Sequence, residues 1–426
     1  MARRQPEHII VIGAGAAGLM AAREFGRAGR KVTVLEARGR CGGRIHPLPT
    51  AEFAYPAEGG AEFVHGEAPV TRGLLRGAGL SLLPVRGRRW RLNQGMLSQD
   101  EMPDSHTERF YECLSRLEAD TTVADFLKRY FAGPEYGRLR HFVVRMVEGY
   151  DAADPARMSM LALRDEWTNG DRSMQARVVG GYGAVIDFLA ADCRRQGAGI
   201  HLHAAVTAIE ATDERAIVHC ANGDTHFGDA AILTVPLPVL NEIVLSPALR
   251  ERASTAADIG FGNVIKVLLR FKSRWWTSGK GMDLSDLLFL LSDEPIPVWW
   301  TQHPTDHPVL TGWVAGPGTG RMAQLAEAGL VESGLASLAA IFGLSPERLR
   351  QDLAAAHAIN WARDPFAGGA YSYATPETRK AQSSLAGPEG GAVFFSGEAM
   401  YRGRDMGTVE AALASGQDAA RAVLAP

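Results

Sequence analysis

The stretch from His8 to Glu36 constrains the fold of this chain more than any other. The short β-branched apolar run His8–Ile12 predicts a buried strand, and it ends in a glycine-rich turn. A helical stretch follows, and a second apolar run, Val32–Leu35, predicts a strand that ends at Glu36. A strand, a glycine-rich turn, a helix and a second strand in this order are typical of a βαβ unit that binds a dinucleotide.

The residue types in the turn support this interpretation. Gly13 permits the tight turn, Gly15 lets backbone approach a pyrophosphate, and Gly18 lets the helix lie close to the strand. The start of the helix offers free N–H groups and the positive end of its dipole to the phosphates. Glu36, about 20 residues further on, is placed to accept a hydrogen bond from a ribose hydroxyl. An acid there also argues against a 2′-phosphate, so we do not expect NADP.

Composition limits the partners and the compartment. The 426 residues leave room for two domains, and a net charge of −3 gives no reason to expect nucleic acid. The four cysteines lack metal-site spacing, so we expect reduced thiols, no metal site and no disulfide framework. No signal peptide fits before the first strand, and no apolar run approaches the length of a membrane span. We therefore expect a cytoplasmic protein without a transmembrane segment, and a peripheral membrane contact is left open.

Several motifs resemble those of one family. Arg38–Arg44 resembles the R-x-G-G-R stretch that follows the dinucleotide unit in the flavin amine oxidase family. Glu58–Gly66 resembles the family's E-x-G-A-x-x-x-x-G segment, and Thr234–Leu237 resembles its T-x-P-L. These motifs occur in the family's order over nearly the whole chain, and a second dinucleotide fingerprint for NAD(P)H is missing. The resemblance therefore implies FAD as the cofactor, nearest in detail to the polyamine oxidase-like branch.

The resemblance also implies a fold and a division into domains. The fold class is α/β, with a Rossmann-like FAD-binding domain assembled from discontinuous segments and an α+β substrate-binding domain whose mixed sheet is flanked by helices. The FAD-binding domain takes residues 1–69, 195–259 and 387–426. The substrate-binding domain takes residues 70–194 and 260–386.

Local patterns predict further elements. Helical signals dominate from Val70 to Arg195, and the basic run Arg86–Arg91 within this stretch is interpreted as a solvated face. Gly260–Phe271 predicts one strand. Asn222–Gly223 is a turn dipeptide between two β-type runs and predicts a hairpin. Ser345 and the proline after it predict the start of a helix that ends near His357.

The resemblance assigns catalytic roles to four residues. Lys266 matches the family lysine that holds a water against flavin N5 and supports oxygen reduction; the alternative is an edge strand whose lysine snorkels. Trp361 matches the tryptophan that lines the flavin pocket. Tyr371 matches an aromatic wall over the substrate face of the flavin, with a packing role as the alternative. His65 falls where the polyamine oxidase branch has a histidine facing the substrate, with a structural role as the alternative.

The resemblance also assigns the residues that contact FAD. The backbone of Val206 holds the adenine, Glu398 contacts the ribityl or ribose side, and the start of the last helix offers N–H groups to flavin O2 and N1. Ala370 stands where monoamine oxidases have a covalent cysteine, so we expect non-covalent FAD. The full set is Gly13, Gly15, Ala17, Gly18, Glu36, Ala37, Arg38, Gly43, Arg44, Gly60, Ala61, Glu62, Phe63, Val206, Trp361, Gly397, Glu398, Thr408 and Val409.

Together these matches imply an FAD-dependent amine oxidase. Hydride passes from the amine α-carbon to flavin N5, the imine hydrolyses to an aldehyde or ketone, and O2 is reduced to hydrogen peroxide. The expected partners are a small-molecule amine and O2, and a homodimer is left open. His65 and Thr408 favour a secondary or longer amine, because Thr408 replaces the second tyrosine of monoamine oxidases. Two alternatives stay open: a flavin-dependent desaturase or protoporphyrinogen-oxidase-like enzyme, and a non-catalytic flavin-binding partner protein.

Overall fold

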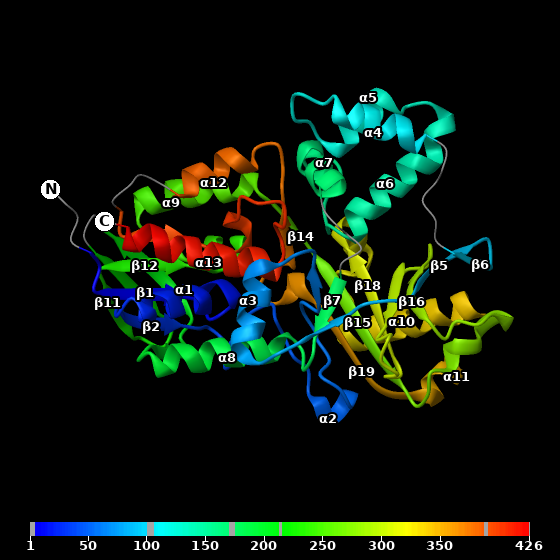
Figure 1. Cartoon of the computed structure of the whole chain (residues 1–426), viewed down its shortest axis with the longest axis horizontal. Helices are drawn as coiled ribbons and strands as arrows, with labels where there is room; N and C mark the ends of the chain where they lie inside the picture. The colour runs from blue at the N-terminus through cyan, green and yellow to red at the C-terminus, as the bar shows by residue number, and fades with distance from the viewer. Residues whose placement is uncertain (1–4, 100–105, 170–174, 213–214, 387–390, 426) are drawn as a thin grey trace.

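The computed structural model describes residues 5–99, 106–169, 175–212, 215–386 and 391–425. Within these ranges the strands form five sheets, and two of them position the site: a five-stranded parallel sheet and a seven-stranded mixed sheet. Figure 1 shows the parallel sheet and its helices in one half of the molecule and the seven-stranded sheet in the other. The predicted domain boundary at Gly387 falls in residues 387–390, outside the described ranges.

The five-stranded sheet is parallel throughout and has β1 at its centre. Its apolar strands are buried because helices cover one face and a second sheet covers the other. In spatial order the strands are β21 (Val393–Phe395), β12 (Ala230–Leu233), β1 (His8–Ile12), β2 (Lys31–Leu35) and β8 (Gly199–His201).

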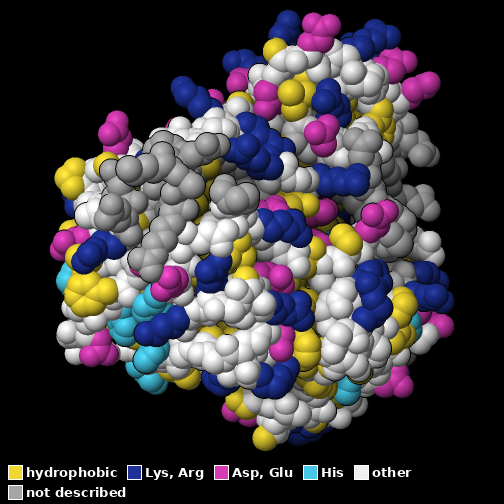
Figure 2. Space-filling model, turned by 60° about the vertical axis from the view of Figure 1, so that its left-hand side comes forward, with side chains coloured by type: hydrophobic (Ala, Val, Ile, Leu, Met, Phe, Trp, Pro, Cys, Tyr) yellow, Lys and Arg dark blue, Asp and Glu magenta, His cyan; other side chains and the backbone are white. Residues whose placement is uncertain are grey.

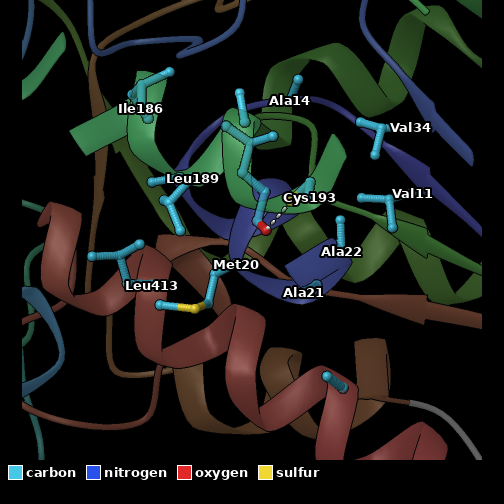
Figure 3. Packing of buried hydrophobic residues seen from close by; sticks show 14 of the residues in the cluster. Val11, Ala14, Met20, Ala21, Ala22, Val34, Ile186, Leu189, Cys193 and Leu413 are labelled. Atoms are coloured by element: carbon cyan, nitrogen blue, oxygen red, sulfur yellow. Dashed lines mark hydrogen bonds between the residues drawn. The ribbon is translucent and has the colours of Figure 1, made fainter. Parts of the chain in front are cut away.

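Three helices cover one face of the parallel sheet. Helix α1 (Ala16–Arg27) lies between α13 (Val409–Leu424) and α8 (Tyr182–Arg195). Figure 3 shows the apolar side chains of these helices meeting over the sheet, and the thiol of Cys193 donates to the carbonyl of Leu19 at 3.3 Å. This packing holds the N-terminus of α1 at the carboxyl edge of the sheet, where ligands bind in folds of this kind.

Two glycines of the first turn let α1 sit this close to β1. Gly13 has a φ of +104°, which residues with a side chain rarely adopt. A Cβ on Gly18 would lie 1.9 Å from the carbonyl oxygen of Gly13. The predicted role of Gly18 in helix–strand packing is thereby confirmed.

A four-stranded sheet, antiparallel except for the parallel pairing of its edge strand β13 with β9, covers the other face of the parallel sheet. Its first two strands form the hairpin that Asn222–Gly223 predicts, with Gly223 at a φ of +89°. In spatial order the strands are β11 (Thr225–Gly228), β10 (Ala216–Cys220), β9 (Val206–Ala211) and β13 (Val244–Leu245).

The seven-stranded sheet packs one face on α10 (Glu327–Phe342), where its apolar side chains form a second core. Strand β15 is interior, paired on both sides, so the interpretation of Lys266 as a snorkelling edge-strand residue is wrong. In spatial order the strands are β19 (Leu353–Asn360), β15 (Val264–Phe271), β18 (Val309–Ala315), β17 (Val298–Thr301), β16 (Leu287–Leu291), β5 (Arg88–Asn93) and β6 (Met96–Gln99).

Four helices form a separate cluster with its own aromatic core, at the top of Figure 1. They are α4 (Thr107–Ser115), α5 (Val123–Tyr130), α6 (Gly137–Gly149) and α7 (Met160–Asn169). The remaining α-helices and strands are α2 (Thr50–Phe53), α3 (Pro69–Ala78), α9 (Pro247–Ser254), α11 (Pro346–Asp352), α12 (Thr378–Ala386), β3 (Phe63–His65), β4 (Leu82–Pro84), β7 (Gln175–Val178), β14 (Gly260–Gly262) and β20 (Tyr371–Tyr373).

Helices dominate Val70–Arg195 as predicted, although β4 to β7 also lie in this stretch. The basic run forms part of β5, with Trp90 buried between the exposed Arg89 and the half-buried Arg91. Two other local predictions are wrong, because long-range strand pairing overrides a local pattern. The helix that Ser345 caps ends at Asp352, because the following residues pair with β15 as strand β19. The predicted strand Gly260–Phe271 is divided into β14 and β15, which join different sheets.

In the described part of the chain no single helix is long and apolar enough to cross a membrane. The 3₁₀ helix at Gly316–Met322 and α10 pass the same length and composition criteria only as a pair bent by 110°. Figure 2 shows a face on which Lys and Arg side chains are interspersed with Asp and Glu, while histidines gather towards one side.

Candidate active site

One cavity of about 1330 Å³ connects the parallel sheet with the seven-stranded sheet. Ligand pockets commonly measure about 300–1,000 Å³, so this cavity has room for a dinucleotide and a second small molecule. Every site residue expected from the sequence lines it except Gly18, which lies behind the turn. These residues come from segments far apart in the chain, and the fold brings them together in one place.

The end of the cavity at β1 has the shape of a pyrophosphate cradle. A Cβ on Gly15 would have its nearest neighbour 4.0 Å away, so a side chain there would fill the cavity. Gly15 is also the N-cap of α1 and supplies no side-chain cap, which leaves the first N–H groups of α1 to a ligand. The bare turn and the helix N-terminus therefore fit a phosphate group.

Glu36 holds the backbone on both sides of this cradle. Its Oε2 accepts from the backbone N–H of Ala14 at 2.8 Å, and its Oε1 accepts from that of Arg38 at 2.9 Å. An ionised carboxylate has about four acceptor sites, so Glu36 can also accept from a hydroxyl in the cavity. Ala37 and Val206 line the cavity beside it.

An ion pair ties the first motif to the last. Arg44 donates to Oε1 of Glu398 and to the carbonyl of Ala370, each at 2.7 Å. The hydroxyl of Ser372 donates to the other oxygen of Glu398. This contact joins the R-x-G-G-R run to a segment 354 residues later, next to the φ +139° glycine Gly397.

Helix α13 points its N-terminus at the cavity. The hydroxyl of Thr408 accepts from the backbone N–H of Ala411 at 3.1 Å and so caps the helix. Thr408 and Val409 both line the cavity. The positive end of this helix dipole thus faces whatever the cavity holds, which favours an anionic group there.

The opposite wall carries a buried ion pair. Nζ of Lys266 lies 2.9 Å from Oε2 of Glu62 and donates to the carbonyl of Gly60 at 3.1 Å. The Lys266 and Glu62 side chains are only 1% and 7% exposed. Lys266 therefore keeps its position through protein contacts.

Three further donors converge on Glu62. Arg177 donates from Nε at 2.8 Å, Trp300 from Nε1 at 3.1 Å and Gln302 from Nε2 at 3.2 Å. Burial alone would raise the pKa of Glu62, but Lys266 and Arg177 outweigh burial and lower this pKa to about 2. Glu62 is therefore a carboxylate at all ordinary pH values. The sequence interpretation missed these three donors, which lie in β7 (Arg177), in β17 (Trp300) and directly after β17 (Gln302).

Aromatic residues form the rest of this wall. Trp361 is 4% exposed and its Nε1 donates to the carbonyl of Gly59 at 3.3 Å. The hydroxyl of Tyr371 donates to the carbonyl of Tyr150 at 2.7 Å, and burial raises the pKa of Tyr371 well above its ordinary value. The aromatic wall thus has fixed polar edges and ring faces that border the cavity.

His65 is held by two neighbours at the edge of the cavity. Its Nδ1 lies 3.2 Å from the Tyr150 hydroxyl and 3.4 Å from Nε2 of Gln175. The His65 ring also meets the Tyr150 ring edge-on, with centroids 5.7 Å apart. The ring is thus anchored while it borders the cavity.

Comparison with known proteins decides the family. The profile described as "Flavin containing amine oxidoreductase" matches residues 16–424. The chain belongs to this family. A probable polyamine oxidase 4 of Arabidopsis thaliana is 28% identical over 97% of this chain and 87% of that protein. Human lysine-specific histone demethylase 2 is 27% identical over 92% of this chain and 50% of that protein.

Solved structures of this family share the fold of the chain. A cyclohexylamine oxidase from Brevibacterium oxydans superposes with a TM-score of 0.79 at 21% identity, over 98% of this chain and 99% of that chain. A putrescine oxidase bound to putrescine gives 0.79 at 20% identity, over 99% of both.

The resemblance to flavin amine oxidases and the predicted fold class are therefore confirmed. As a family member the chain is a flavoprotein oxidoreductase that acts on CH–NH₂ groups.

Proposed function

We propose that this flavin amine oxidase uses non-covalently bound FAD to oxidise a small-molecule amine, giving an aldehyde or ketone and hydrogen peroxide. One observation carries the proposal: the glycine cradle and Lys266 border the same cavity. A dinucleotide anchored at the cradle has room to extend to the wall formed by Lys266, Trp361 and Tyr371. The curated relatives named polyamine oxidases support an amine as the substrate.

The residues present fit FAD. The bare turn at Gly15 and the start of α1 suit the pyrophosphate, and Glu36 suits a ribose hydroxyl. The start of α13 suits the part of the ring that becomes anionic on reduction. Ala370 offers no thiol for a covalent bond. When bound, FAD supplies hydride acceptance at N5 and passes the electrons on to dioxygen.

The residues of the chain would position the reactants and supply charge. Trp361 and Tyr371 exclude water and orient a neutral amine, whose lone pair must be free to stabilise the cation formed as its C–H bond breaks. The ammonium of Lys266 stabilises negative charge that develops on dioxygen during its reduction. Because Glu62 fixes this ammonium at 2.9 Å, its position is set before the reaction. A preorganised charge of this kind costs no reorganisation during the reaction.

An amine panel tests the proposal on the purified yellow protein. Mono-, di- and polyamines are mixed with it without oxygen, and loss of the oxidised flavin absorbance is followed. Air is then admitted and hydrogen peroxide is measured, with free FAD plus amine as the control. Bleaching followed by peroxide supports the proposal. Bleaching by protoporphyrinogen or another C–C substrate, with none by amines, favours the desaturase alternative. No bleaching by any donor favours the non-catalytic alternative.

A further inference from the structure

One face of the seven-stranded sheet forms a wall of the cavity from Lys266 outwards. Lys266 pairs in register with Trp313, Trp313 with Val298, Val298 with Leu291, and Leu291 with Arg91. Residues directly opposite each other in a sheet share a face, so this row has a cation at each end and apolar side chains between. Strands lie ~4.8 Å apart, which places the Cα atoms of Lys266 and Arg91 ~19 Å apart.

A second row on the same face has the same character. Trp300 pairs with Phe289, and Phe289 pairs with Arg89. Nζ of Lys266 lies 5.4 Å from the Trp300 ring centroid, the two aromatic ring centroids are 6.3 Å apart, and the Arg89 guanidinium lies 5.1 Å from the Phe289 ring. These side chains all line the cavity. An apolar wall therefore leads from Lys266 to Arg89.

A third arginine reaches the same end from helix α6. Arg145 lines the cavity and donates from Nη2 to the carbonyl of Ser292 at 2.7 Å. Its Nη1 lies 3.8 Å from Asp293, whose side chain is 76% exposed. Burial lowers the pKa of Arg145 and the charge of Arg91 adds to this, whereas Asp293 acts in the opposite direction. Asp293 and Glu148, the acids that act on Arg145, do not line the cavity. The acids that line it from the helical cluster and the segment after α6 are Asp120, Asp151, Asp165 and Glu166.

We propose that Arg89 and Arg145, which line the cavity, bind a carboxylate of the substrate. Together with Arg91, which lies beside them and does not line the cavity, we call them the basic end. The substrate is then an amine that carries its carboxylate several carbons away from the oxidised carbon, on an aliphatic chain that lies along the apolar wall. A diamine of the same length would bring a second ammonium to Arg89, Arg91 and Arg145, where like charge repels it. This inference rests on the proposed function and names the substrate class of the same site.

Matched ligands test the charge preference. Hexylamine, 6-aminohexanoate and 1,6-diaminohexane differ only at the far end, and the corresponding octane series covers a longer span. We expect the second-order rate constant of anaerobic flavin reduction to favour the amino acid over the diamine by at least about tenfold in one series, as a charge-assisted hydrogen bond provides. Quenching of tryptophan fluorescence gives the binding order without turnover. An equal or reversed preference in both series would overturn the inference.

Charge reversal at the basic end is the sharper test. Arg89 is exposed, so Arg89→Glu should fold normally. It should lower the preference for the carboxylate about tenfold, and Arg89→Glu with Arg145→Glu should invert it. Arg421→Gln, at an exposed site on α13 that does not line the cavity, is the matched control and should leave the preference unchanged. If Arg89→Glu prefers the amino acid over the diamine as strongly as wild type does, the inference is contradicted.

The two proposals fail in different ways. Reduction of the flavin by none of the six compounds would count against amine oxidation, and the binding order would still judge the basic end. Reduction by all of them at equal second-order rate constants, with equal affinities, would leave amine oxidation standing and reject the basic end as a carboxylate site.

Discussion

The ammonium of Lys266 lies 2.9 Å from the carboxylate of Glu62, and both side chains are almost completely buried. Either charge alone would be costly to bury, so each one makes the other possible. Arg177 adds a second cation, which contacts the other carboxylate oxygen of Glu62 at 2.8 Å. The cluster formed by Lys266, Glu62 and Arg177 therefore has a net positive charge beside the cavity, on the wall where we propose that dioxygen is reduced.

Replacement of Lys266 separates oxygen reduction from amine oxidation. Lys266→Met should keep the fold, because methionine is of similar length and Glu62 retains Arg177 and Trp300. Removing an electrostatic donor from a developing anion typically costs about 10²–10³ in rate. We expect this loss in reoxidation of the reduced flavin and a smaller loss in anaerobic reduction by substrate.

Stopped-flow traces of the two half-reactions measure both rates. The matched control is Lys272→Met, which replaces an exposed lysine directly after the end of β15 and should change neither rate. A reoxidation rate within about threefold of wild type would contradict a catalytic role for Lys266.

Replacement of Glu62 should destabilise the protein more than replacement of Lys266. Glu62→Gln leaves Lys266 buried beside Arg177 without a counter-charge, which typically costs about 3–5 kcal/mol in the free energy of unfolding. Adding Lys266→Met should recover part of this loss, because it removes one unpaired cation. Chemical denaturation of the four proteins of this double-mutant cycle gives the coupling.

An exposed pair provides the comparison for this cycle. Glu332→Gln breaks a contact with Arg350 in which both side chains are about half exposed, and it should cost less than about 1 kcal/mol. Additive effects of Glu62→Gln and Lys266→Met would mean that the two charges do not stabilise each other.

The dinucleotide half of the fold can be predicted from sequence because its signals are local. Its elements are adjacent in the chain: the strand at His8–Ile12, the glycines that follow and the strand before Glu36. They occur in the structure in the predicted order. The Asn222–Gly223 hairpin is local in the same way. In each case the residues that make the turn also determine which segments pair.

The Glu62 cluster and β19 could not be predicted in this way. Glu62 gains Arg177 and Trp300 from strands more than a hundred residues away, and nothing near any of the three indicates that they meet. The residues after Asp352 have high helix propensity, and only pairing with β15 makes them a strand. Tertiary contacts decide both features.

The flavin should leave the protein on denaturation. Ala370 lines the cavity, with its N–H bonded to the carbonyl of Gly262 at 2.8 Å and its own carbonyl bonded to Arg44. Its methyl group cannot form a thioether, so acid precipitation should release all yellow colour into the supernatant. Colour retained in the washed pellet would contradict non-covalent binding.

The last prediction concerns Glu58, whose side chain is 5% exposed. Its Oε1 accepts from the backbone N–H of Gly183 at 3.3 Å, and its Oε2 has no hydrogen-bond partner among the described residues. Burial raises the pKa of Glu58 from 4.5 to about 7, although the charge of Lys266 acts against this rise. The folded protein therefore holds this proton more tightly than the unfolded chain does.

The stabilisation linked to that proton is complete below pH 4.5 and is lost as the pH rises to about 7. The difference between the two pKa values corresponds to ~3 kcal/mol. Glu58→Gln keeps the neutral shape and cannot ionise, so its free energy of unfolding should fall less than that of wild type between pH 5 and pH 8, by ~2.5 kcal/mol. Glu52→Gln, at an exposed site, should behave as wild type. Urea unfolding at both pH values measures the difference. A Glu58→Gln variant that follows the wild-type pH dependence would show that Glu58 is ionised in the folded protein, with its charge balanced by Lys266.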